Sequence, residues 1–200
     1  MCWNAEVSLN TFLLGIFSVG LATLNGVSAP LFSLFYISYI TMQLVEYFAW
    51  KNLTKPDVIR VLSIWGLALV LIQPLILLIA SGAPWFYLIA YGVFAAYFAY
   101  YVVANLRFDM TRAENGHLAW HWLAVPGWMM AVWLVFAVIA CLYARAYIWV
   151  ALAVISAGAI YYTYATTHTW GSLWCWIVNV FALYLLYAVF RRAFCARPGG

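Results

Sequence analysis

Long runs of apolar residues, separated by short polar segments, occupy most of the chain. Each run is close to the about 20 residues that an α-helix needs to cross the hydrocarbon core of a bilayer. The runs are too long for strands and lack the period-two alternation of a membrane barrel. They lie at residues 7–25, 31–50, 59–80, 84–104, 123–143, 147–166 and 171–190. The pattern predicts an all-α integral membrane protein, a seven-transmembrane-helix bundle with short loops that forms one domain over residues 1–200.

Composition agrees with this pattern, because 69% of the residues are hydrophobic and only 7% are charged. A chain of this composition cannot cover a soluble globule with polar surface, so the lipid bilayer is its expected partner. A net charge of +4, scattered along the chain, excludes nucleic-acid binding, and four cysteines do not make a disulfide scaffold. We expect the first helix to stay in the mature protein rather than to be cleaved off as a signal peptide. No Lys or Arg precedes it, and the small residues at 27–29 are followed directly by Pro30, which disfavours cleavage there.

Short connections make successive helices antiparallel, which assigns each loop to one of two faces. We call the N side the face that holds the N-terminus and the segments 51–58, 105–122 and 167–170. All acidic residues fall toward the N side, whereas the opposite face carries four arginines without an acid. Those arginines are Arg145, Arg191, Arg192 and Arg197. The N side carries five Lys and Arg against these four, so the cluster of arginines directly after the last helix decides the orientation. It predicts a multi-pass protein with a cytoplasmic C-terminus.

Tryptophans show the same asymmetry, since most of them lie near the N side. They are Trp3, Trp50, Trp65, Trp120, Trp122, Trp170, Trp174 and Trp176, against Trp85 and Trp149 near the other face. Tryptophan settles at headgroup depth because its ring is apolar and its N–H is polar. The rings therefore form an interfacial belt, or some of them line a cavity that opens to the N side.

One face of the second helix carries the most informative polar residues. Tyr39, Gln43, Glu46 and Trp50 are spaced four, three and four apart, which places them on one side of a helix. A carboxyl group within a membrane helix is costly and marks a functional site by default. We expect Asn10 and Asn179, on the first and last helices, to face inward at a similar depth. These six residues form the predicted ligand, ion or proton site.

Two interpretations of Glu46 stay open. A buried carboxyl without a cation beside it has a raised pKa and can serve as a proton-coupling group. It can equally remain protonated and hold helices together through a hydrogen bond to Gln43 or an asparagine. Gln73 lies deeper, on the third helix, just before Pro74, whose missing N–H frees a backbone carbonyl and can kink the helix.

Histidines and cysteines on the N side form a weaker candidate site for a metal ion. His117 and His121 are four apart, so a helix that begins after Gly116 would bring them to one face. Imidazole and thiolate groups are ligands of zinc and copper. The full candidate set is His117, His121, His168, Cys2 and Cys175. The alternatives are ordinary interfacial histidines, and cysteines that pack as small residues or form a Cys2–Cys175 disulfide.

The chain opens Met1-Cys2-Trp3-Asn4-Ala5 and carries Gln43-x-x-Glu46 in its second helix. These residues resemble those of an uncharacterised family of small multi-pass membrane proteins from bacteria and large DNA viruses. Members open Met-Cys-Phe-Ser-Ala, carry Gln-x-x-Glu with a following tryptophan in the second helix, and begin the last helix with Trp-Cys. This chain opens Met1-Cys2-Trp3-Asn4-Ala5, continues with Gln43, Glu46 and Trp50, and has Trp174-Cys175; it departs at Trp3, Asn4 and Tyr47. The resemblance implies a multi-helix fold and points to Cys2, Gln43, Glu46 and Cys175, without a mechanism.

Three functions remain compatible with the sequence. The first is a small transporter or channel for a small molecule or ion, with Glu46 as a protonatable group. The second is a non-catalytic receptor, pigment-binding or assembly protein, and the third, an enzyme that uses a metal or a thiol, is favoured least. Covalent retinal is excluded, because the only lysines are Lys51 and Lys55. Small residues four apart, such as Ala153 and Ala157, suit close helix packing within the bundle or in a homo-oligomer.

Overall fold

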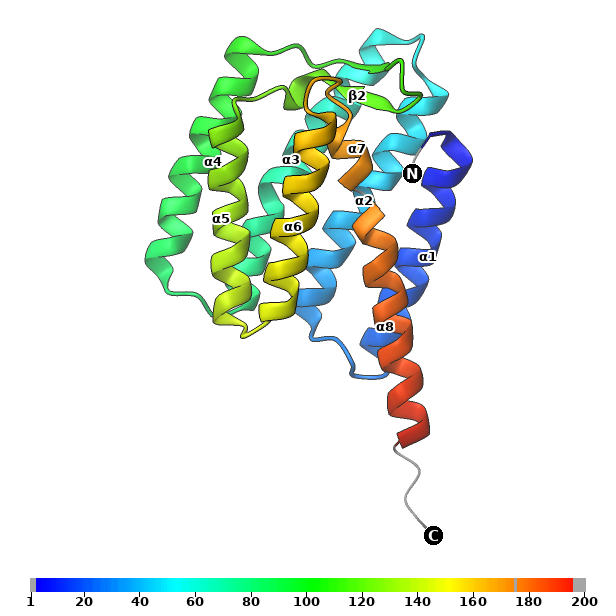
Figure 1. Cartoon of the computed structure of the whole chain (residues 1–200), viewed down its shortest axis with the longest axis vertical. Helices are drawn as coiled ribbons and strands as arrows, with labels where there is room; N and C mark the ends of the chain where they lie inside the picture. Colours follow the sequence, from blue (N-terminus) through cyan, green and yellow to red (C-terminus); the bar gives the residue numbers. More distant parts are fainter. Residues whose placement is uncertain (1–2, 175, 196–200) are drawn as a thin grey trace.

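The computed structural model describes residues 3–174 and 176–195, which form an up-and-down bundle of helices (Figure 1). The helices are α1 (Ala5–Leu24), α2 (Pro30–Lys51), α3 (Pro56–Ala80), α4 (Trp85–Asn105), α5 (Gly127–Tyr143), α6 (Tyr147–Tyr164), α7 (Trp170–Trp174) and α8 (Trp176–Cys195). The all-α prediction is confirmed. Within the described part of the chain, six helical segments are long and apolar enough to cross a membrane, with α7 and α8 counted together, and α5 is a shorter apolar helix.

Helix starts follow local sequence signals. The side chain of Asn4 accepts a hydrogen bond of 2.8 Å from the backbone N–H of Val7 and so caps α1. Pro30 and Pro56 occupy the first positions of α2 and α3, where a missing N–H costs nothing. Helix α5 begins at Gly127, four residues later than the apolar pattern predicts, since Pro126 precedes it and residues 121–123 form a short 3-10 helix, η1.

A small β-hairpin covers the N side of the bundle (Figure 1). Its strands, β1 (Met110–Arg112) and β2 (Leu118–Trp120), pair antiparallel with Thr111 opposite Ala119. A strand, rather than a helix, therefore follows Gly116, and the helical spacing that would have brought His117 and His121 to one face does not occur. Gly116 has a φ of +81°, which suits a turn, and the backbone N–H of Ala113 donates to the carbonyl of His117. The dipeptide Asn115-Gly116 was thus a hairpin signal rather than a helix start.

Pro74 interrupts the hydrogen bonding of α3, and a neighbouring helix repairs the interruption. A residue at position 74 would normally donate its N–H to the carbonyl of Val70, but proline has none. Nε1 of Trp133, on α5, donates to that carbonyl at 2.9 Å. One residue further along, the carbonyl of Leu71 accepts a hydrogen bond from the hydroxyl of Tyr91, on α4. The break at Pro74 therefore fixes α3 against both α4 and α5.

We expect Trp133→Phe to lower the free energy of unfolding by about 1–3 kcal/mol, because the buried carbonyl of Val70 then has no donor. In the Pro74→Ala background the new backbone N–H supplies that donor, so the same Trp133→Phe substitution should cost clearly less. Unfolding of the four proteins in mixed detergent micelles, followed by tryptophan fluorescence, measures the coupling. Equal costs in both backgrounds would show that the indole N–H does not compensate for Pro74.

The buried core lies mainly in the N-side half of the bundle. Its largest fully buried side chains there include Trp122, Phe98, Ile59, Leu118 and Met129, contributed by η1, α4, α3, β2 and α5. In contrast, α6 has no buried residue along its whole length. The other half of the bundle is thus less completely filled, and the candidate site lies there.

Candidate functional site

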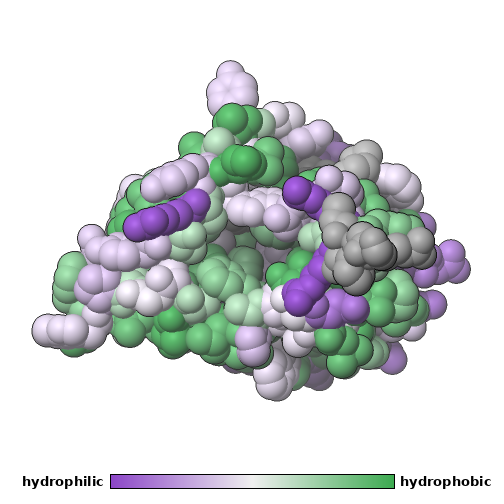
Figure 2. All heavy atoms as spheres, turned by 90° about the horizontal axis from the view of Figure 1, so that it is seen from below, coloured by the Kyte–Doolittle hydropathy of each residue, from purple (hydrophilic) through white to green (hydrophobic). Residues whose placement is uncertain are grey.

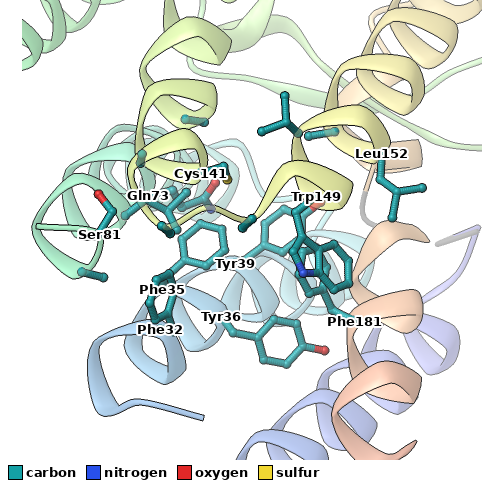
Figure 3. A pocket seen from close by; sticks show the side chains of 18 of the residues that line it. Phe32, Phe35, Tyr36, Tyr39, Gln73, Ser81, Cys141, Trp149, Leu152 and Phe181 are labelled. Atoms are coloured by element: carbon teal, nitrogen blue, oxygen red, sulfur yellow. The ribbon is translucent and has the colours of Figure 1, made fainter. Parts of the chain in front are cut away.

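A cavity of about 590 Å³ lies inside the bundle. It is lined by side chains from α2, α3, α5, α6 and α8, together with the turns that join helices at the end opposite the N side. The lining is mostly apolar and rich in aromatic rings (Figure 3). Its aromatic residues are Phe32, Phe35, Tyr36, Tyr39, Trp133, Trp149, Phe181 and Tyr184. Cavities of this size, lined by apolar and aromatic groups, are typical of small-molecule sites.

The mouth of the cavity lies at the end of the bundle opposite the N side. It is lined by residues 27–29, Ser81, Ala144 and Ala146, which all belong to turns at that end. Figure 2 shows this end hollowed between mostly apolar side chains, with hydrophilic side chains on both sides of the hollow. The cavity therefore opens at this end. One interpretation of the tryptophans, a cavity that opens to the N side, is wrong for this cavity.

Positive charge surrounds the mouth. Arg145 lies between two lining residues of the α5–α6 turn and is exposed. Nη1 of Arg192 donates a hydrogen bond of 2.6 Å to the carbonyl of Gly26, directly before the lining residue Val27. Among the described residues, all acidic side chains lie in the other half of the molecule or at its N-side surface. The mouth is therefore electropositive, which favours anionic ligands.

Aromatic contacts close the cavity between α6 and α8. The rings of Trp149 and Phe181 stack with centroids 4.2 Å apart and an angle of 12° between their planes. Tyr184 meets Trp149 edge-on at 5.0 Å. On the other side of α8, the hydroxyl of Tyr36 donates to the carbonyl of Val178 at 2.8 Å and holds α8 against α2. Trp149 and Phe181 are seen at the right of Figure 3.

At its inner end the cavity is constricted by Tyr39, Gln73 and Trp133. The same three residues line a second void of about 30 Å³, which continues toward the N side and reaches Trp120 and Trp170. The cavity and this void therefore follow one line through the bundle, interrupted by the constriction.

Tryptophans of the hairpin segment close the N side beyond the small void. The rings of Trp120 and Trp122 stack with centroids 5.4 Å apart, and both are buried. Two glycines leave room for them, because a Cβ atom on Gly66 would lie 2.7 Å from Cζ2 of Trp122 and one on Gly171 would lie 2.6 Å from Cε3 of Trp120. The rings are thus packed into the backbone of α3 and α7. We call this structure the tryptophan cap.

The polar face predicted on α2 points into the bundle on the N side of the constriction. Gln43 and Glu46 are fully buried, at 0% exposure, and Tyr39 and Trp50 are half-buried. Glu46 lies seven residues from Tyr39, or about 10 Å along the helix toward the N side. The carboxyl group is therefore close to the line of the cavity and void, but it does not line either of them.

Two of the residues expected beside Glu46 lie elsewhere. Asn10 is exposed, because Ser8 and Thr11 occupy the buried face of α1 and position 10 points away from it. Asn179 is half-buried and follows Val178, whose carbonyl binds Tyr36, about three turns along α2 from Glu46. Sequence reasoning missed the buried residues Ser8, Thr11 and Ser63. Ser8, Thr11 and Gly15 are spaced three and four apart on one helix face, and Ser63 lies four residues after Ile59, which was a usable signal.

The three histidines lie in the N-side loops. The rings of His121 and His168 lie 5.9 Å apart, and Thr111 Oγ1 is 2.9 Å from Nε2 of His121. His117 is buried in the hairpin. Burial lowers the pKa of His117 and of His121, and for His121 the opposing effect of Asp109 is smaller. Within residues 3–174 and 176–195, no group of three or more His, Cys, Asp or Glu side chains could hold a metal ion.

The remaining candidates from the sequence are two cysteines and the tryptophans of the N side. Cys2 and Cys175 lie outside the described residues, so their predicted metal-binding or disulfide roles stay predictions. Trp3 and Trp65 are exposed at the N side, as a membrane belt requires, whereas the tryptophan cap is internal. The tryptophans therefore serve two purposes that sequence position alone did not separate.

Comparison of the chain with protein-family models, with curated proteins and with solved structures finds no match. The resemblance to the uncharacterised membrane family stays a prediction.

Proposed function

We propose that this protein spans a membrane and transports a small amphipathic anion with an aromatic body. The observation that carries the proposal is the cavity, which is open at one end of the bundle and closed at the other by the tryptophan cap. A binding site near the middle of the membrane, accessible from one side at a time, is the arrangement that alternating access requires. The small void on the far side of the constriction supports a path that continues to the N side.

The chemistry of the cavity supports this class of substrate. Aromatic side chains from α2, α5, α6 and α8 offer ring faces for stacking an aromatic body. Arg145 and Arg192 at the mouth favour a negative charge on its outer end. The positive-inside rule supports a cytoplasmic position for this mouth and for the C-terminus.

Glu46 is the proton-coupling group in this proposal. Its carboxyl is fully buried on the same helix as Tyr39, which forms part of the constriction. Loss or gain of a charge in such an apolar setting changes the free energy of the surrounding packing strongly. Protonation of Glu46 would therefore bias the position of α2 and the state of the constriction.

The proposal is tested by uptake of radiolabelled anthracene-2-sulfonate into liposomes that contain the purified protein. This probe is aromatic and keeps its negative charge at every working pH, so a pH effect cannot come from its own titration. We expect saturable uptake that a proton gradient accelerates, and we expect Glu46→Gln to lose that acceleration. Glu6→Gln, which changes an exposed carboxyl at the start of α1, is the matched control.

The aromatic cavity also suits a second function, that of a receptor or other ligand-binding membrane protein. The two functions differ in one result. Saturable binding of anthracene-2-sulfonate without uptake into liposomes would favour the binding protein over the transporter. Uptake that responds to the proton gradient equally in Glu46→Gln and in the wild-type protein would reject Glu46 as the coupling group.

A further inference from the structure

We propose that Gln73 is the recognition residue of the cavity, and that its ligands carry a carbonyl-type hydrogen-bond acceptor in the part of the molecule that lies deepest. This inference rests on the proposed function, because it specifies the substrate class of the same cavity. Gln73 lies on α3 at the constriction and is 3% exposed. Figure 3 shows it among the side chains that line the cavity.

Several polar groups of the cavity wall already use their hydrogen-bond donors. The hydroxyl of Tyr36 donates to the carbonyl of Val178, and Nε1 of Trp133 donates to that of Val70. The hydroxyl groups of the lining serines likewise donate to backbone carbonyls: Ser28 to Ala29, Ser81 to Leu78, and Ser156 to Leu152. These groups hold the helices in place and have no donor left for a ligand.

The amide of Gln73 is different. Its Nε2 is buried and has no hydrogen-bond partner among the described residues. A buried amide N–H without an acceptor is costly, and native proteins almost always satisfy such groups. Rotation about the last side-chain torsion, which is broad for glutamine, lets the amide present this N–H to the cavity. A ligand oxygen that accepts from Nε2 would remove the cost.

The surroundings of Gln73 favour a neutral hydrogen-bond acceptor on the ligand over a charged one. No charged side chain among the described residues lines the cavity, so a carboxylate or sulfonate at this depth would be buried without a cation. A neutral carbonyl oxygen on an aromatic ring system accepts one hydrogen bond and otherwise stacks on the neighbouring rings. The charged end of the ligand belongs at the mouth instead, near Arg145 and Arg192.

A matched pair of probes tests this inference. Anthraquinone-2-sulfonate and anthracene-2-sulfonate have nearly the same shape and charge, and only the first has carbonyl oxygens. Calorimetric titration of the protein in nanodiscs, with empty nanodiscs subtracted, gives both affinities. We expect the anthraquinone to bind about tenfold tighter, the effect of one buried hydrogen bond. Gln73→Met should abolish this preference, so that the two probes bind the variant with similar affinity.

Ser156→Ala is the matched control, because Ser156 also lines the cavity but its hydroxyl is bound to the carbonyl of Leu152. This variant should keep the full preference. Gln73→Leu provides a second test variant if Gln73→Met does not fold. Equal affinities for the two probes, or a preference that survives in both Gln73 variants, would overturn the inference and leave cavity binding in place. Absence of saturable binding of either probe would overturn the proposed function itself.

Discussion

Replacing Ala153 with tryptophan is expected to lower the affinity of the cavity for anthracene-2-sulfonate by more than about a hundredfold, because a clash in the site opposes binding directly. Ala153 lies on α6 and lines the cavity, to which aromatic side chains of α2 also contribute. An indole at this position would occupy space that the ligand needs. Since α6 has no buried residue, the larger side chain can enter the cavity without displacing the core.

Ala151→Trp provides the control for this substitution. Ala151 lies two residues earlier on the same helix and is exposed, so its side chain points away from the cavity. Both variants add one tryptophan to α6, and the same calorimetric titration in nanodiscs compares them. Similar affinity in the two variants would mean that the probe binds outside the cavity.

Replacing Trp122 with alanine is expected to lower the free energy of unfolding by about 3–5 kcal/mol, the usual cost of removing a fully buried aromatic side chain. Trp122 has 0% exposure, stacks on Trp120 and packs directly against the backbone at Gly66. Its loss leaves a hole in the tryptophan cap. Denaturation in mixed detergent micelles measures the change in stability.

The Trp122→Phe variant distinguishes the contribution of aromatic packing from that of the indole N–H. Nε1 of Trp122 is buried and has no hydrogen-bond partner among the described residues, so the indole contributes through packing rather than through its N–H. We therefore expect Trp122→Phe to cost clearly less than Trp122→Ala. Equal losses would show that the N–H has a role that packing does not supply.

The course of the chain was predictable because apolar run length is a direct physical requirement of a membrane helix. Helices α1 to α4 and α6 begin and end within a few residues of the predicted bounds. The hairpin was missed because Leu118, Ala119 and Trp120 form too short an apolar run to distinguish a strand from a helix start. The buried positions of Gln43 and Glu46 agree with their predicted face of α2, whereas Asn10 lies outside the buried face of α1.

The cavity was not predictable from the sequence. Phe32, Phe35 and Phe181 line it, yet an apolar side chain has the same pattern whether it faces a cavity, lipid or a packed neighbour. Its position depends on how closely five helices approach one another, which run length does not encode. Small residues such as Ala137 and Ala153 were the available signal, and the sequence alone assigned that class of residue to helix packing.

Under the proposed function, residues of α6 can alter which ligand binds at little cost to folding. It contributes a large part of the cavity wall, from Trp149 to Ser156, but not one buried residue to the core. Substitutions outside the core usually change stability by less than about 0.5 kcal/mol. New side chains between Leu152 and Ser156 would therefore change the ligands of the proposed site at little cost in stability, whereas Ile160, Tyr161 and Tyr164 of the same helix pack against the core.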